Sequence, residues 1–155
     1  MTHLPTEILL VEDNPNDAEL ALYALHRYHG STQVDVVHDG AEALDYMFST
    51  GAYAASTRES NPKVILLDLK LPKVDGLEVL ERIKSDPRTQ TIPVVVLTSS
   101  REESDIQRSY ELGVNSYLVK PIDFEQFTEV VRLLGVYWLH HNQLPFLKSI
   151  FPAGE

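Results

Sequence analysis

Cysteine is absent from the 155-residue sequence, which excludes disulfide scaffolds, thiolate metal sites and cysteine nucleophiles. Basic residues are also few: 13 Lys and Arg stand against 23 Asp and Glu, and the net charge is −10. This balance argues against binding to nucleic acid or to an anionic membrane, both of which need clustered cations. No apolar run approaches the roughly 18 residues of a membrane span, and no signal-peptide pattern opens the chain. We therefore expect a soluble protein of the cytoplasm.

The composition that remains is that of an ordinary globular domain. Apolar residues make up 43% and charged residues 23% of a chain whose length suits a single domain. Five short runs rich in Val, Ile and Leu mostly lack polar alternation, which is typical of strands covered on both faces of a sheet. These runs are Ile8–Val11, Val34–Val37, Val64–Leu67, Val94–Leu97 and Tyr117–Val119.

Helical patterns separate these runs and carry their own capping signals. Asn14 stands before a proline and is predicted to cap the first helix, while Asp39 and Asp123 are predicted to cap the second and the fifth. Gly113 is placed to end a fourth helix over residues 102–112, whose inner face offers few apolar residues. The alternation of strand and helix predicts an α/β fold, with a parallel sheet covered by helices on both faces.

Polar residues stand where four of the predicted strands end. Glu12 and Asp13 follow the first strand, Asp68 the third, Thr98 the fourth and Lys120 the fifth. Parallel strands end at one edge of a sheet, where doubly wound folds bind their ligands. Three carboxylates there would repel one another unless a cation joined them, and oxygen ligands favour Mg²⁺, Mn²⁺ or Ca²⁺. With a metal, an ammonium and a hydroxyl beside it, Asp68 is a candidate nucleophile towards a phosphoryl group.

Each of these features has an ordinary structural explanation when it is taken alone. Asp-Asn-Pro after a strand is a common turn and helix cap, a lone Asp often caps a helix, and Thr-Ser-Ser is usual in polar loops. The joint pattern at four strand ends favours a phosphoryl-transfer site over these separate explanations.

The same positions carry motifs by which the chain, from about Thr6 to Leu134, resembles the receiver domains of two-component response regulators. The matching segments are LLVEDN at 9–14, LLDLKLPKVDG at 66–76, VVLTSS at 95–100 and YLVKP at 117–121. The resemblance implies a doubly wound, flavodoxin-like sheet of five parallel strands in the order 2-1-3-4-5. It also implies that the protein is not an enzyme in the usual sense, because it catalyses only its own phosphorylation and dephosphorylation.

The resemblance gives a role to each acidic residue at the sheet edge. Asp68 would accept a phosphoryl group from a phosphohistidine on a sensor histidine kinase. Asp13 and Asp68 would bind Mg²⁺, or Mn²⁺ in its place, and Glu12 would act largely through water. The backbone carbonyl of Lys70 would complete the protein ligands of the metal.

Residues of the fourth and fifth strands would hold the phosphoryl group and transmit its arrival. By the same resemblance, Thr98 would donate its hydroxyl and Lys120 its ammonium to phosphoryl oxygens. Tyr117 resembles the switch aromatic that turns inward as Thr98 moves, and the bond between Lys120 and Pro121 is expected to be cis. Phosphorylation would then change the face formed by the fourth helix, the fifth strand and the fifth helix.

Two segments exceed a minimal receiver. The receiver would span residues 1–137, with an enlarged and exposed loop over residues 49–62, and residues 138–155 would form a C-terminal extension without an output domain. The extension is apolar and is expected to pack on its own domain or on a partner. These additions resemble those of the single-domain response regulators of cyanobacterial and other bacterial phytochromes. That resemblance implies a phytochrome as kinase partner, and a homodimer formed through the extension, the fourth helix, the fifth strand and the fifth helix.

Other functions stay open at this point. The chain would suit another two-component pathway, as a phosphorelay intermediate or a motor regulator. A phosphatase of the haloacid dehalogenase type also uses an Asp nucleophile with Mg²⁺, but it needs a second Asp two positions on, where Lys70 stands. A nucleotide-binding flavodoxin-like protein is disfavoured, because no Gly-rich loop follows the first strand.

Overall fold

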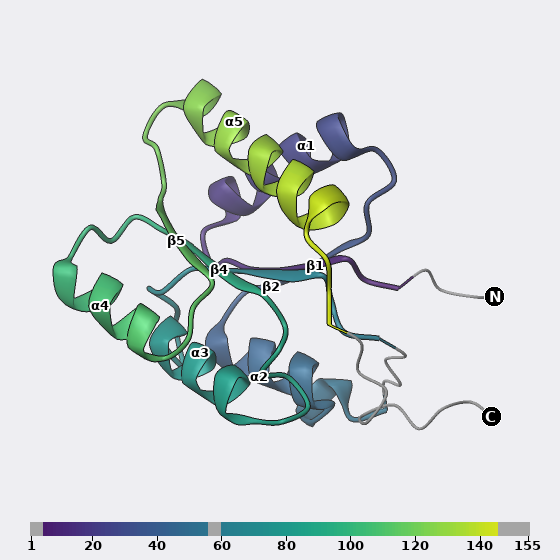
Figure 1. The fold of residues 1–155 in the computed structure, drawn as a ribbon, viewed down its shortest axis with the longest axis vertical. Coiled ribbons are helices and arrows are strands. Elements are labelled where there is room, and N and C mark those ends of the chain that lie inside the picture. The colour runs from purple at the N-terminus through teal and green to yellow at the C-terminus, as the bar shows by residue number, and fades with distance from the viewer. Residues whose placement is uncertain (1–4, 56–59, 146–155) are drawn as a thin grey trace.

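The computed structural model describes residues 5–55 and 60–145, which form a parallel five-stranded sheet between two layers of helices (Figure 1). The sheet order is β2-β1-β3-β4-β5, and in its registers Leu10 lies beside Leu66 and Val96 beside Tyr117. This confirms the predicted α/β fold and the expected order of its strands. The strands are β1 (Ile8–Val11), β2 (Val34–Val37), β3 (Val64–Leu67), β4 (Val94–Thr98) and β5 (Ser116–Val119).

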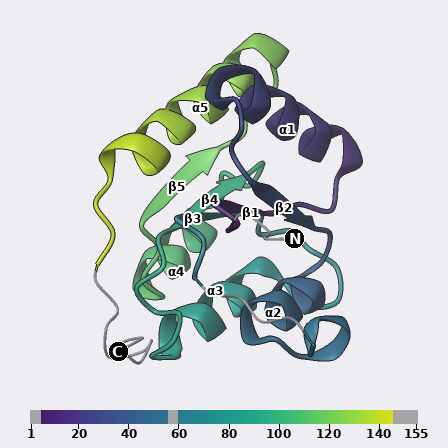
Figure 2. The same cartoon turned by 90° about the vertical axis from the view of Figure 1, so that its right-hand side faces the viewer.

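The helices divide between the two faces of the sheet, as Figures 1 and 2 show from two sides. The helices α1 and α5 cover one face, and α2, α3 and α4 cover the other. Helices on both faces leave the strand ends as the open edge of the sheet. The helices are α1 (Pro15–His29), α2 (Gly40–Phe48), α3 (Gly76–Ser85), α4 (Glu103–Glu111) and α5 (Phe124–Gly135).

Short polar side chains begin most of these helices. The side chains of Asn14, Asp39, Asp75 and Asp123 each accept a hydrogen bond from a backbone N–H in the first turn of the following helix. Such N-caps satisfy donors that have no partner within the helix, and each is worth about 1 kcal/mol. The predicted caps at Asn14, Asp39 and Asp123 are therefore confirmed.

The core consists of two apolar clusters, one on each side of the sheet. Leu9 and Val11 of β1 belong to the cluster beneath α2 and α3, whereas Ile8 and Leu10 belong to the cluster beneath α1 and α5. Successive side chains of a strand point to opposite faces, so a strand covered on both sides is apolar at every position. This is why the strand sequences show little polar alternation.

The helix α4 is the most loosely packed of the five, because Ser109 is its only buried residue. It ends where Gly113 adopts a φ of +100°, a left-handed conformation that costs a glycine little. The predicted helix and its glycine stop are both confirmed, and so is the scarcity of apolar contacts on its inner face.

The enlarged loop is only partly exposed. A 3₁₀ turn, η1 (Gly51–Tyr53), follows α2, and the ring of Tyr53 packs edge-on against Tyr46 at 5.3 Å. The Tyr53 hydroxyl also donates a hydrogen bond of 2.8 Å to Glu42, and Pro62 is buried at the other end of the loop. Most of the described residues of this loop are exposed, as expected, whereas Tyr53 is half-buried and Pro62 is buried. Residues 56–59 lie outside the described residues.

The chain continues past α5 as a π-helical turn, η2 (Val136–His141). Residue 138, where the C-terminal extension was expected to begin, therefore lies within a helical turn. Leu139 of this turn is buried, and Trp138 packs against the cluster beneath α1 and α5. The first part of the extension thus packs on its own domain, and residues 146–155 lie outside the described residues. No helix in the described ranges is both long and apolar enough to cross a membrane.

Candidate functional site

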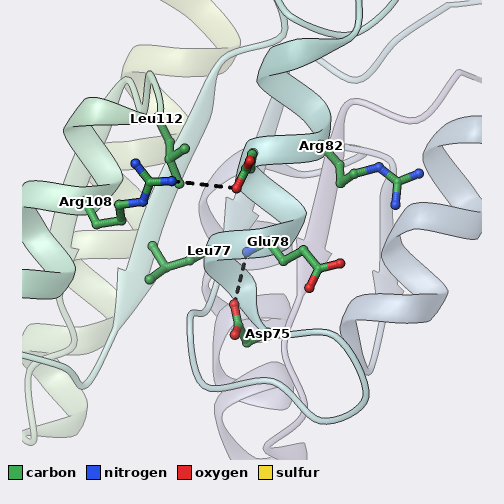
Figure 3. Close-up of a pocket in the computed structure, with 7 residues that line it drawn as sticks. Asp75, Leu77, Glu78, Arg82, Arg108 and Leu112 are labelled. Carbon is green, nitrogen blue, oxygen red and sulfur yellow. Dashed lines mark hydrogen bonds and ion pairs between the residues drawn. The ribbon is translucent and has the colours of Figure 1, made fainter.

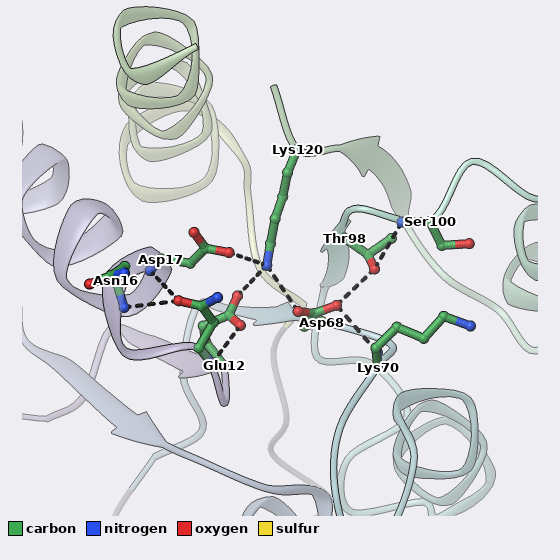
Figure 4. Close-up of polar contacts among 9 residues, drawn as sticks. Glu12, Asn16, Asp17, Asp68, Lys70, Thr98, Ser100 and Lys120 are labelled. Carbon is green, nitrogen blue, oxygen red and sulfur yellow. Dashed lines mark hydrogen bonds and ion pairs between the residues drawn. The ribbon is translucent and has the colours of Figure 1, made fainter. Parts of the chain in front are cut away.

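The carboxyl ends of four strands bring the predicted site residues together (Figure 4). Glu12 follows β1, Asp68 follows β3, Thr98 is the last residue of β4, and Lys120 follows β5. Glu12, Asp68 and Thr98 are buried. The parallel registers place these strand ends side by side, so residues more than 100 positions apart meet at one edge.

Lys120 is the centre of the charged contacts at this edge. Its Nζ lies 2.7 Å from Glu12 Oε1, 2.8 Å from Asp17 Oδ2 and 2.9 Å from Asp68 Oδ2. The side chains of Lys120 and Asp68 are 9% and 6% exposed, so water screens their attraction only weakly. One ammonium therefore holds three carboxylates, and the site retains an excess of negative charge.

The other oxygen of Asp68 accepts two further hydrogen bonds. Thr98 Oγ1 donates to Asp68 Oδ1 at 2.7 Å, and the backbone N–H of Lys70 donates to the same oxygen at 3.3 Å. The hydroxyl of Thr98 in turn accepts from the backbone N–H of Ser100 at 3.4 Å. These contacts orient the Asp68 carboxylate, with one oxygen facing Lys120 and the other facing Thr98.

The pKa values of the two buried carboxyl groups move in opposite directions. Burial raises the pKa of Glu12 to about 7, and the negative charge of Asp68 adds to that rise while Lys120 opposes it. Burial acts on the Asp68 carboxyl in the same sense, but the charge of Lys120 and the hydrogen bonds from Lys120 and Thr98 outweigh it, so the pKa of Asp68 is lowered. Asp68 is thus kept ionised, as a nucleophile requires.

Three carboxylates at this edge lie close enough to share a cation. Glu12, Asp13 and Asp68 each offer an oxygen, and these oxygens lie within 4.8 Å of one another. Asp13 is exposed, whereas the other two residues are buried. Oxygen-only ligands and uncompensated negative charge suit a hard divalent cation such as Mg²⁺, Mn²⁺ or Ca²⁺. The residues therefore fit the expected metal, and the site is open towards solvent on the side of Asp13.

Tyr117 lies near the Asp68 carboxylate but bonds to a neighbouring loop. Its hydroxyl donates a hydrogen bond of 3.0 Å to the backbone carbonyl of Ser100, two residues after Thr98. The side chain is half-buried, and burial raises the pKa of its phenol. Tyr117 therefore contacts the loop that follows Thr98.

The prediction of a cis bond between Lys120 and Pro121 is wrong. No cis peptide bond occurs in residues 5–55 and 60–145, so this bond is trans. The trans isomer is the lower in energy for a bond to proline, by about 0.5–1 kcal/mol. With the trans bond, the Lys120 ammonium already reaches all three of its carboxylate partners.

Two residues of the site were missed by the sequence patterns. Asp17, in the first turn of α1, holds Lys120, and Asp105, in the first turn of α4, holds the ammonium of Lys70 at 3.4 Å. An acid in the first turn of a helix is so common that neither position carried a signal of its own. The signal that could have found them is the position of each helix, which begins beside the strand ends. Side chains of its first turn therefore lie at the same edge of the sheet.

Comparison with known proteins agrees with this geometry. The sequence profile of the response regulator receiver domain family matches residues 8–132, which is most of the chain. The probable methanogenesis regulatory protein FilR2 of Methanothrix harundinacea is 44% identical over 141 residues, which cover 91% of this chain and 88% of FilR2. Response regulator Rcp1 of Synechocystis is 41% identical over 141 residues, which cover 91% of this chain and 94% of Rcp1.

Solved structures extend the same similarity to the fold. The phosphorylated cyanobacterial phytochrome response regulator RcpA is 44% identical, with a TM-score of 0.84 over 92% of this chain and 100% of its own. The Mn²⁺-bound form of Rcp1 gives the same TM-score and the same coverage at 41% identity. On sequence, fold and the arrangement of its strand ends, the chain belongs to the family of response regulator receiver domains.

Proposed function

We propose that this protein is a response regulator of the cytoplasm, whose Asp68 accepts a phosphoryl group from the phosphohistidine of a phytochrome sensor kinase. An oxygen of the Asp68 carboxylate attacks phosphorus, and the bond between phosphorus and the imidazole nitrogen breaks. The electron pair of that bond returns to the imidazole, which takes a proton from solvent. The product is an acyl phosphate on Asp68 and a free histidine on the kinase.

The observation that carries this proposal is the environment of Asp68. Its two oxygens are held by Lys120 on one side and by Thr98 on the other, at 2.9 and 2.7 Å. An ammonium and a hydroxyl are the groups that stabilise charge on a transferring phosphoryl group, where catalysis is mostly positioning and electrostatics. Thr98 and Lys120 therefore support Asp68 as the acceptor and would hold the phosphoryl oxygens after transfer.

Glu12, Asp13 and Asp68 are the side chains that would hold Mg²⁺, with the backbone carbonyl of Lys70 as a further ligand. A bound Mg²⁺ would neutralise charge on the transferred group. The oxygen donor set supports Mg²⁺, and Mn²⁺ would substitute for it. The related Rcp1 has been solved in an Mn²⁺-bound form, which supports a divalent cation as the metal of this site.

Apolar side chains beside the site support docking of a kinase there. Ile122, two residues after Lys120, is 99% exposed, and Phe124 and Tyr23 are both about half exposed, with their ring centroids 6.4 Å apart. Exposed apolar groups that gather beside a charged centre are typical of a binding surface for another protein. The similarity to RcpA, a cyanobacterial phytochrome response regulator, supports a phytochrome as that partner.

The signal would leave the domain through a homodimer. A hollow of about 490 Å³ lies beside β5 and α5, and its apolar lining includes Leu118, Val130, Leu133, Tyr137 and Trp138. Leu133 and Tyr137 are each 51% exposed, although they are large and apolar. This face, α4 and the C-terminal extension together form the surface that would bind a second copy of this chain. The net charge of −10 makes nucleic acid an unsuitable partner.

The test is labelling by acetyl phosphate in the presence of Mg²⁺. The wild-type chain is expected to take up one phosphoryl group, and Asp68→Asn is expected to take up none, because an amide oxygen is a poor nucleophile. Asp123→Asn is a matched control, since asparagine caps a helix as well as aspartate does. Equal labelling of wild type and Asp68→Asn would refute the assignment of Asp68. Steady turnover of small phosphate esters would instead indicate a phosphatase.

A further inference from the structure

Among the three carboxylates that hold Lys120, only Asp17 is assigned neither to the metal nor to the phosphoryl group. Its Oδ2 lies 2.8 Å from Lys120 Nζ, and the oxygens of Glu12 and Asp68 lie at 2.7 and 2.9 Å. Figure 4 shows Asp17 and Asp68 on opposite sides of the Lys120 ammonium. The ammonium is thus held from the side of α1 by a residue with no part in the chemistry at Asp68.

The first turn of α1 fixes the position of Asp17. Its backbone N–H donates a hydrogen bond of 3.1 Å to the side chain of Asn14, which caps the helix, and the next residue, Ala18, is buried. A carboxylate is favoured at the start of a helix, where the helix dipole is positive. The side chain of Asp17 is 29% exposed, whereas that of Lys120 is 9% exposed. The position of Asp17 therefore depends on α1 and not on the state of Asp68.

The other two partners of Lys120 change when the site is in use. Glu12 and Asp68 belong to the group of carboxylates that would hold the metal. A carboxylate that faces a divalent cation attracts a nearby ammonium less, and the cation also repels the ammonium. Asp68 in addition gives up its carboxylate charge when it becomes an acyl phosphate. Asp17 is then the partner of Lys120 whose charge stays as it was.

Acids on the other side of the sheet have other partners. Asp75, at the start of α3, accepts a hydrogen bond from the backbone N–H of Glu78, and Glu81 pairs with Arg108 of α4 at 3.8 Å (Figure 3). Within residues 5–55 and 60–145, no fourth carboxylate lies within ion-pair distance of Lys120. In this part of the chain no other acid is placed to do what Asp17 does.

We propose that Asp17 is a positioning residue for phosphoryl transfer, which anchors the Lys120 ammonium beside Asp68 while the metal and the phosphoryl group engage the other two carboxylates. The proposal rests on the proposed function of Asp68 as phosphoacceptor. With acetyl phosphate as donor, an oxygen of Asp68 bonds to phosphorus, the bond from phosphorus to the bridging oxygen breaks, and its electron pair leaves with acetate. The anchored ammonium stabilises the charge that spreads over the phosphoryl oxygens during this transfer.

Anchoring and simple charge repulsion predict opposite effects when Asp17 is replaced. Acetyl phosphate is an anion, so the removal of one negative charge beside the site should by itself speed up labelling. Loss of the anchor should instead slow labelling, because the Lys120 ammonium is then free to move away from the phosphoryl oxygens. The direction of the change therefore distinguishes a positioning role from a purely electrostatic one.

The first measurement is the rate of Asp68 labelling at saturating acetyl phosphate and Mg²⁺. Asp17→Ala is expected to be about two- to fivefold slower than the wild type, the range that a partly exposed ion pair allows. Asp17→Asn keeps an oxygen that accepts a hydrogen bond from Lys120, so it should recover part of the rate, and it serves if the alanine variant folds poorly. Glu19→Gln removes an exposed charge from the same helix, where Glu19 has no hydrogen bond or ion pair to another described residue, and should label like the wild type.

The second measurement does not depend on turnover and follows the NMR signal of the Lys120 side-chain ammonium, assigned by its loss in Lys120→Met. In a chelator, Asp17→Ala should keep this signal, because Glu12 and Asp68 still hold the ammonium and slow the exchange of its protons. With Mg²⁺ and beryllofluoride, an analogue of the phosphoryl group, the wild type should keep the signal and Asp17→Ala should lose it. A residue with a merely structural role would not make the signal depend on the state of the site.

Lys84 provides an internal reference for the same spectra. Its Nζ donates hydrogen bonds to oxygens of Gln90, Ile92 and Asn115 at 3.1, 2.7 and 3.0 Å. Asn115 stands before the first residue of β5, so this ammonium lies at the opposite edge of the sheet from the site. Its signal should be the same in every variant and with every addition.

Faster or unchanged labelling of both Asp17 variants would overturn the proposal. A Lys120 signal that persists in Asp17→Ala with Mg²⁺ and beryllofluoride would overturn it as well. If the wild-type chain takes up no label at Asp68, it is the proposed function that fails.

Discussion

The buried carboxyl group of Glu12 should make metal binding depend on pH in the neutral range. Burial raises its pKa from 4.5 to about 7, so at pH 6 most molecules carry a proton on Glu12 that a divalent cation must displace. Below about pH 7 the affinity for Mg²⁺ should therefore fall by up to about tenfold for each pH unit, and above about pH 8 it should level off.

The raised pKa of Glu12 also makes the folding stability of the metal-free protein depend on pH. A raised carboxyl pKa stabilises the fold below the unfolded value of 4.5, and this contribution is lost as the pH rises through about 7. The difference between the pKa values of Glu12 in the unfolded and folded protein corresponds to a free energy of about 3 kcal/mol, at about 1.4 kcal/mol per pH unit. Because Glu12 titrates together with the neighbouring Asp68, this is an upper bound. Adding Mg²⁺ should offset the loss, because the cation binds the ionised form.

Isothermal titration of Mg²⁺ at several values between pH 5.5 and about 8.5 provides the assay. The wild-type chain should release close to one proton per bound ion at the acidic end and almost none at the alkaline end. Glu12→Gln should abolish this proton release, while Glu19→Gln, an exposed residue of α1, should behave as wild type. An Mg²⁺ affinity that stays constant from pH 6 to 8 would refute the role given to Glu12.

Further predictions concern the ammonium, the hydroxyl and the extension. Lys120→Met leaves three carboxylates without their shared ammonium and should lower the free energy of unfolding by about 3 kcal/mol when a chelator is present. Added Mg²⁺ should restore part of this stability, and an unchanged urea midpoint would contradict the prediction. Thr98→Ala should still be labelled but should blunt any phosphorylation-dependent change in self-association, measured by light scattering; a full response would count against Thr98. A chain that ends after Tyr137 loses Trp138 and the buried Leu139 and should lose self-association; an unchanged mass in solution would remove that role.

The sequence was most informative where one local rule decides the structure. The apolar runs of β1 and β3 match the observed strands to the residue, because burial on both faces leaves no other pattern. The caps at Asn14, Asp39 and Asp123 were predicted for a similar reason, since a short polar side chain before a helix has one preferred role. The site followed from the strand ends, because parallel strands must end at one edge.

The rest depends on tertiary contacts that local patterns do not encode. Asp17 and Asp105 read as ordinary first-turn acids, and only packing of α1 and α4 beside the strand ends turns them towards Lys120 and Lys70. The isomer of the bond before Pro121 was carried over from a resemblance and was wrong. The partial burial of the loop after α2 depends on Tyr53, whose ring meets Tyr46 only once the chain has folded.

The most direct test of the central claim is phosphotransfer from a sensor histidine kinase that carries radiolabelled phosphohistidine. With Mg²⁺ and a phytochrome kinase as donor, we predict rapid transfer to the wild-type chain, and recovery of the label as a hydroxylamine-sensitive acyl phosphate on the peptide that contains Asp68. Transfer should be slower from a sensor kinase that is not a phytochrome, and absent for Asp68→Asn. Label on another residue, or none from any histidine kinase, would contradict the account.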